Sequence, residues 1–193
     1  MLEKFSRKIA VWLIKSGILE NDNSELYRYA IQYLLLIIIP TINFLAYCIA
    51  THNIIVGFII LFSFLLIRKY SGGYHCKSST VCLIFSTIIL IFMAWLSNRI
   101  RFSSLSMIIV LFLCESELLL RGPIISVNHS VSQKEKSHFH KCLFLILIVF
   151  DILLFLFWNS NMTHYANCIF IVITVCSIAH IASGIGKNRE RYY

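Results

Sequence analysis

The residues best suited to chemistry lie in one polar segment between two apolar runs, and they are His75 and Cys82. A cysteine attacks a peptide carbonyl as the thiolate, and a nearby histidine can take its proton. A helix N-terminus also stabilises the thiolate, and two good N-cap residues, Ser78 and Ser79, stand just before the apolar run that contains Cys82. We therefore interpret His75 as the base and Cys82 as the nucleophile of a catalytic dyad.

The spacing of the two residues requires the chain to turn between them. Seven residues along a straight helix rise about 10 Å, whereas proton transfer needs a separation of about 3 Å. We expect bends at Gly72-Gly73, which tolerates unusual backbone angles, and at 77–79.

Three other interpretations of this segment stay open. Cys76 is a competing nucleophile beside His75. His75, Cys76 and Cys82 could bind a metal, but no fourth ligand is evident, so we expect no metal and no cofactor. A polar loop can also hold a histidine and a cysteine by chance.

The composition indicates which kind of structural element holds His75 and Cys82 in place. Of 193 residues, 59% are hydrophobic and only 13% are charged, with a mean hydropathy of +0.80. Long apolar runs with few prolines and glycines predict an all-α, polytopic membrane bundle and argue against a β-barrel. We expect a single domain over 1–193, with six transmembrane helices at about 31–50, 54–67, 81–97, 103–120, 142–158 and 165–183.

The parts outside these spans are basic. The N-terminal segment is 1–30. Within 1–20, apolar and basic positions fall on different helical faces, which predicts an amphipathic helix in the membrane interface that contacts anionic lipid. The other parts are polar segments at 68–80 and 121–141 and a basic tail at 184–193. These four segments hold 15 lysines and arginines, against two in the remaining loops.

This asymmetry predicts a multi-pass protein of the cell membrane with both termini and the His75/Cys82 segment in the cytoplasm. It also explains the net charge of +8 without a nucleic-acid partner.

Three acidic residues lie within the apolar runs, where ionisable groups are functional candidates. Glu117 could orient the imidazole of His75, or it could pair with Arg121. Asp151 requires a buried partner, such as Asn43 or a histidine. The third of these acidic residues is Glu115. We interpret residues 138–142, His-Phe-His-Lys-Cys, as solvated loop residues rather than a metal site.

The polar segment resembles the signature of the accessory gene regulator B (AgrB) family of membrane endopeptidases. That signature has an arginine, a glycine pair, a catalytic histidine and a catalytic cysteine seven residues later, here Arg68, Gly72, Gly73, His75 and Cys82. The chain length, the basic N-terminal segment, the spans and a proline-containing loop followed by lysines also match.

The resemblance implies that the protein cleaves an AgrD-like propeptide through an acyl-enzyme thioester and promotes its cyclisation to a thiolactone or lactone quorum-sensing precursor. We also expect a homodimer, partly because the resemblance implies one and partly because six short helices offer little room to enclose a peptide substrate. Ser79 and Glu117 would support the site. The basic surface would attract an acidic substrate tail, with Arg68, Lys69, Lys77, Lys134, Lys136 and Lys141 as candidates.

A second hypothesis is a non-catalytic membrane peptide exporter, in which Asp151 and the glutamates line a path. A third is a membrane scaffold or sensor. An enzyme would require Cys82, whereas an exporter would require Asp151 and tolerate the loss of Cys82.

Overall fold

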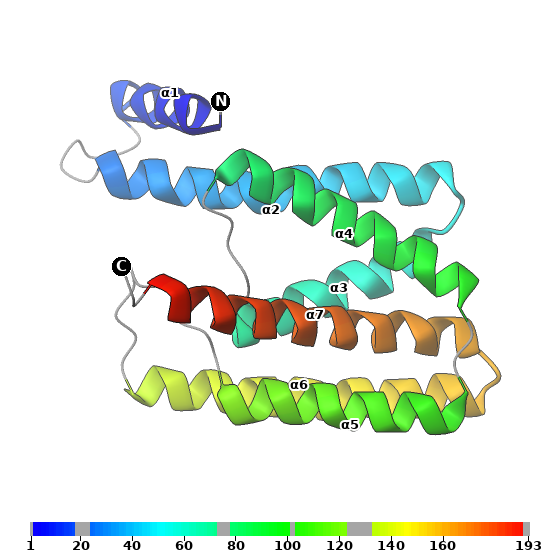
Figure 1. Ribbon diagram of the computed structural model, residues 1–193. Coiled ribbons are helices and arrows are strands. Elements are labelled where there is room, and N and C mark those ends of the chain that lie inside the picture. The colour runs from blue at the N-terminus through cyan, green and yellow to red at the C-terminus, as the bar shows by residue number, and fades with distance from the viewer. Residues whose placement is uncertain (1, 18–23, 73–77, 101–102, 123–132, 191–193) are drawn as a thin grey trace. The chain divides into compact units, whose positions relative to one another are not determined.

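The computed structural model describes residues 2–17, 24–72, 78–100, 103–122 and 133–190. These residues form seven α-helices and no strand, which confirms the all-α prediction (Figure 1). The helices are α1 (Leu2–Lys15), α2 (Ser24–Ala50), α3 (Ile54–Ser71), α4 (Ser79–Arg99), α5 (Ser104–Arg121), α6 (Gln133–Asn159) and α7 (Thr163–Glu190).

Among the described residues, five helices are long and apolar enough to cross a membrane: α2, α3, α4, α6 and α7. The polytopic helical fold is therefore as predicted, although the sequence analysis expected six spans. The remaining expected span is present as α5, which holds Glu115, Glu117 and Arg121 within 18 residues. Ionisable side chains are costly in lipid, so α5 differs in character from the other five.

Two segments outside the predicted spans are partly helical. The predicted loop at 121–141 is wrong in its last part, because α6 begins at Gln133 and includes Lys134, Lys136 and His138. The basic tail predicted from 184 continues α7 as far as Glu190. Hydropathy locates the apolar part of a helix, whereas lysine, glutamate and glutamine are good helix formers that extend it.

Contacts group the helices into two compact units. The first unit holds α1, α2 and the beginning of α4, through Ile91. Here α1 packs against α2, with Ala10 buried and with Phe5 and Trp12 exposed. The amphipathic helix expected near the N-terminus is present, with large apolar side chains available to lipid. The expectation of one domain over 1–193 stays a prediction.

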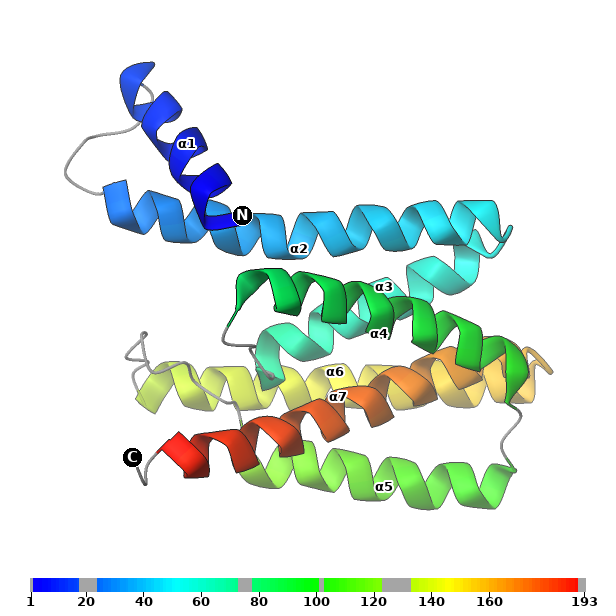
Figure 2. The same cartoon turned by 45° about the horizontal axis from the view of Figure 1, so that its top comes forward.

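The second unit holds α3, α5, α6, α7 and the end of α4. In it α7 packs against α3, α5 and α6, and α6 also packs against α3 and α5. Figures 1 and 2 show α7, in orange to red, running beside α5 and α6. Buried isoleucines of α7, Ile169, Ile171 and Ile173, make this helix the centre of the unit.

The turn between α6 and α7 is short and uncharged, as predicted. Asn161 has a φ of 59°, a left-handed conformation that asparagine tolerates better than most residues. The backbone N–H of Met162 donates to the Phe157 carbonyl at 2.8 Å, and that of Tyr165 donates to the Met162 carbonyl at 3.0 Å. These bonds satisfy groups that the two helix ends leave open.

Candidate functional site

The predicted nucleophile, Cys82, lies in the first turn of α4 and is 7% exposed. Its backbone N–H donates to the Ser78 carbonyl at 3.0 Å, so Ser78 rather than Ser79 stands at the N-cap position. Both serines were candidates for the N-cap, and Ser78 takes this position because its carbonyl accepts the first helical hydrogen bond. The thiol still lies in the turn where the helix dipole favours negative charge.

A side chain of α2 holds the start of α4. The Gln32 amide donates to the Ser79 hydroxyl, within the first unit. This bond fixes the turn that carries Cys82 and gives Ser79 a positioning contact. Sequence analysis did not single out Gln32, although an amide inside an apolar run was the available signal, since polar groups in spans seek partners on other helices.

The signature arginine lies in the last turn of α3. The guanidinium of Arg68 lies 5.5 Å from the centroid of the Phe64 ring, a cation–π distance, and acts electrostatically on Cys176 of α7. Gly72 ends the helix with a φ of 77°, which glycine adopts without steric cost. Its N–H donates to the Arg68 carbonyl at 3.1 Å. The bend predicted at Gly72 is therefore confirmed.

The remaining signature residues, Gly73 and His75, lie outside the described residues. The candidates Cys76 and Lys77 lie outside them as well. The pairing of His75 with Cys82 therefore stays a prediction. Lys69 lies beside the Tyr70 ring, 5.2 Å from its centroid, and Lys134 and Lys136 are exposed at the start of α6.

A second polar centre lies within the second unit, around Glu117 of α5. One carboxylate oxygen, Oε1, lies 3.0 Å from Nδ1 of His180 and 3.3 Å from Nε of Arg121. The other oxygen accepts a hydrogen bond from the Ser177 hydroxyl at 3.1 Å. Nε2 of His180 lies 3.0 Å from the Gly122 carbonyl. His180 is fully buried, so the cluster joins α5 to α7 inside the unit.

The hydrogen-bond partners define what His180 does there. A carbonyl oxygen only accepts, so Nε2 donates to Gly122. On the other side of the ring, Nδ1 faces the Glu117 carboxylate, which also contacts Ser177 and Arg121. The bonds hold the end of α5, where Gly122 has a φ of 67°. The cluster can therefore position a backbone turn.

Sequence analysis found part of this centre. It proposed that Glu117 contacts His75 or Arg121; the structure shows the Arg121 pair, while His75 lies outside the described residues. It missed Ser177 and His180. The signal was their spacing, because residues three apart on a helix share a face and a histidine inside a span needs a partner.

Asp151 of α6 lies within electrostatic range of Glu115 of α5, because α6 packs against α5. The expectation of Asn43 or a histidine as the partner of Asp151 stays a prediction.

The described residues also contain a thiol–imidazole contact that sequence analysis assigned to a loop. The Cys142 sulfur lies 3.5 Å from Nε2 of His138, one helical turn away on α6. This pair is exposed or half-buried. His138 and Cys142 can therefore serve as a control pair for the predicted dyad of His75 and Cys82.

The fold defines a polytopic helical membrane protein with a thiol at the start of one helix. The family model described as Accessory gene regulator B matches residues 6–180, and the chain belongs to this family. No solved structure matches the chain.

Two relatives from Clostridium perfringens are similar to this chain. AgrB-like protein 2 of strain 13 (Type A) is 29% identical over 113 residues, which is 58% of this chain and 53% of the relative. An AgrB-like protein of strain SM101 (Type A) is 27% identical over 113 residues, with the same shares. The matched stretch spans about half the length of these curated relatives.

Proposed function

We propose that this protein is a membrane cysteine endopeptidase that processes an AgrD-like propeptide in quorum sensing. The observation that carries the proposal is the position of Cys82, in the first turn of an apolar helix of a chain that belongs to the AgrB family. Membership supports a role in the processing of the quorum-sensing peptide. The nucleophile, the base and the cyclisation step are our proposal.

In the proposed reaction, His75 takes the thiol proton and the Cys82 sulfur attacks a carbonyl near the C-terminal end of the propeptide. The peptide C–N bond breaks, the released amine takes the proton from His75, and a thioester remains on Cys82. A cysteine or serine of the substrate then attacks the thioester, closes the ring and releases the thiol. The thioester conserves acyl activation, so ring closure requires no ATP.

Exclusion of water favours ring closure over hydrolysis, and Cys82 is buried. We further propose that this site faces the cytoplasm, as the positive charge bias indicates. Arg68, Lys69, Lys134 and Lys136, with Lys77, would attract an acidic propeptide tail. A homodimer is part of the same proposal.

The test uses the full chain in lipid vesicles with a tagged propeptide of this system. Cys82→Ala and His75→Ala should each lower cleavage at least a thousandfold, because both act on the same step. Cys142→Ala and His138→Ala change a matched thiol–imidazole pair and should leave cleavage within twofold. Cys76→Ser should retain most cleavage.

A hydroxylamine-labile adduct between the protein and its propeptide would support the thioester, and Cys82→Ser should abolish that lability. Normal cleavage by the Cys82 and His75 variants would reject the enzyme hypothesis.

A passive or coupled exporter is the second candidate, and the observation in its favour is that two acids of neighbouring helices, Glu115 and Asp151, lie within electrostatic range of each other. Asp151→Asn should then abolish transport of the mature peptide into vesicles, with Cys82→Ala tolerated. An endopeptidase shows the opposite pattern for cleavage.

A further inference from the structure

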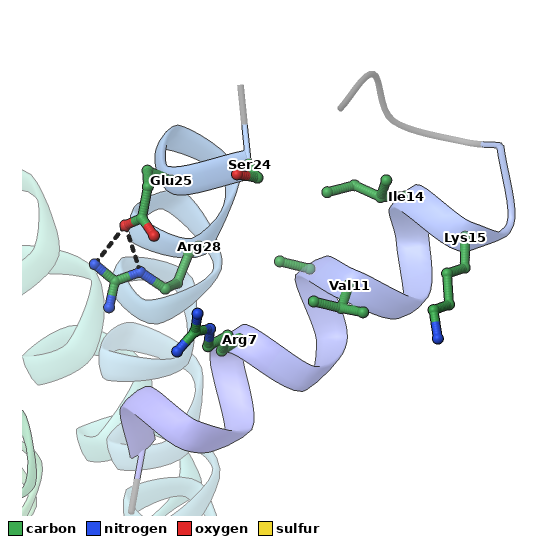
Figure 3. Close-up of a pocket in the computed structure, with 8 residues that line it drawn as sticks. Arg7, Val11, Ile14, Lys15, Ser24, Glu25 and Arg28 are labelled. Carbon is green, nitrogen blue, oxygen red and sulfur yellow. Dashed lines mark hydrogen bonds and ion pairs between the residues drawn. The ribbon is translucent and has the colours of Figure 1, made fainter. Parts of the chain in front are cut away.

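The first unit contains a cavity of about 370 Å³ between α1 and α2 (Figure 3). A volume of this size is within the range of small-molecule sites, about 300–1,000 Å³. Its apolar wall is formed by α1. The lining residues are Arg7, Ala10, Val11, Ile14, Lys15, Ser24, Glu25 and Arg28.

The cavity carries an excess of positive charge. Three cations, Arg7, Lys15 and Arg28, line it with one acid, Glu25, which leaves a formal charge of +2. Glu25 pairs with Arg28, with Oε2 lying 2.6 Å from Nη2 and 2.8 Å from Nε. Figure 3 shows Arg7 reaching from α1 toward α2. Among the described residues, no acid pairs with Arg7, so the cavity suits an anion.

The length of α2 places this cavity near the membrane surface. Its 27 residues rise about 40 Å, whereas the hydrocarbon core is about 30 Å thick. The charged residues Glu25 and Arg28 lie in the first two turns, so the excess length belongs at this end. Trp12 of α1 and Tyr29 and Tyr33 of α2 are exposed, and such aromatic residues gather at the headgroup level.

We propose that the α1–α2 cavity binds the phosphate of an anionic phospholipid. Arg7 and Arg28 bind the phosphate oxygens, for which a guanidinium is well shaped. Val11 and Ile14 contact the apolar part of the same lipid. Glu25 limits the affinity, because it occupies Arg28 when the cavity is empty. The site would fix the angle at which α1 leaves the membrane-spanning helix α2.

The test is a titration of the purified full chain with short-chain phosphatidylglycerol, with bound lipid counted by native mass spectrometry. The Arg7→Gln/Arg28→Gln double variant should bind at least tenfold more weakly than the unmodified protein. Lys8→Gln, which removes an exposed charge of α1 outside the cavity, should bind within twofold. Glu25→Gln should bind severalfold more tightly, because Arg28 is released.

Equal affinities for the double variant and Lys8→Gln would overturn the proposal. So would equal binding of phosphatidylcholine, or of inorganic phosphate at the same concentration, since either would remove the requirement for an anionic lipid. Displacement of the lipid by an acidic peptide of higher affinity would assign the cavity to a peptide instead. Arg7→Gln alone, which breaks no ion pair among the described residues, should weaken binding severalfold and guards against a folding defect in the double variant.

Discussion

Of the helices α6 and α7 in the second unit, the more apolar one is the less buried, which is the opposite of the pattern in water-soluble proteins. The candidate span of α6 is the more apolar, yet 17% of its most apolar window is buried, against 61% for α7. Lipid is as apolar as a leucine side chain, so burial inside a membrane bundle depends on packing and polar contacts rather than on hydropathy. The more polar helix therefore forms the centre.

The buried polar side chains of α7 show the reason. Asn167 donates from Nδ2 to the Ile100 carbonyl at 3.1 Å, Ser177 donates to Glu117, and His180 contacts Glu117 and Gly122. Each of these groups would lack a partner in lipid, where an unsatisfied group is costly. On α6, by contrast, the exposed side chains include Phe144, Leu145, Ile148, Val149, Ile152 and Phe155.

The largest effect should come from removing the imidazole at the centre of α7. His180→Leu removes a hydrogen-bond partner from two acceptors, the Glu117 carboxylate and the Gly122 carbonyl. A lost partner of this kind costs about 1–3 kcal/mol, so we expect a loss of about 3 kcal/mol in total. His138→Leu, on the exposed side of α6, should change the free energy of unfolding by about 0.5 kcal/mol or less. Reversible unfolding in mixed micelles measures both. Equal losses would remove the contrast between the two helices.

A matched isoleucine pair sharpens the same comparison without polar groups. Ile173 of α7 is 0% exposed, whereas Ile152 of α6 is 53% exposed. Ile173→Ala should lower the free energy of unfolding by about 2 kcal/mol, because it leaves a cavity. Ile152→Ala exchanges side-chain contacts for lipid contacts, so its loss should stay below about 0.5 kcal/mol. A larger loss for Ile152→Ala would mean that α6 is covered by protein.

A smaller effect is expected at the contact between α7 and the end of α4. Asn167→Ala removes the hydrogen bond to the Ile100 carbonyl and should lower the free energy of unfolding by about 1 kcal/mol. Asn159→Ala, at the exposed end of α6, is the control and should have little effect. Faster amide exchange near residue 100 in the Asn167 variant alone would locate the change.

The smallest effect should come from Ser177→Ala. Hydrogen bonds between membrane helices contribute about 0.6 kcal/mol on average, and Glu117 keeps His180 and Arg121 as partners. A double-mutant cycle with Glu117→Gln measures the coupling. A coupling near zero would show that the hydroxyl contributes nothing to holding α5 on α7.

Most of the fold could be predicted because long apolar runs leave few alternatives to helices in lipid. The ends could not: nothing in hydropathy shows that α6 begins at Gln133, well before its apolar part. The sequence also did not show which polar side chains pair, because His180 contacts Glu117, which lies 63 positions earlier in the chain. The Cys82 turn was predictable locally, from a serine before an apolar run, but Gln32, from another helix, was not.

The tight link between α6 and α7 has a consequence for biogenesis. Residues 160–162 are Ser-Asn-Met, so the two helices can enter the bilayer together as a hairpin whose tip carries no charge. Moving one lysine, arginine or aspartate to mid-bilayer costs about 2.5–3.5 kcal/mol on the insertion scale, and this tip avoids that barrier. Helix α7, the centre of the unit, would therefore insert together with α6, the most apolar of the five candidate spans.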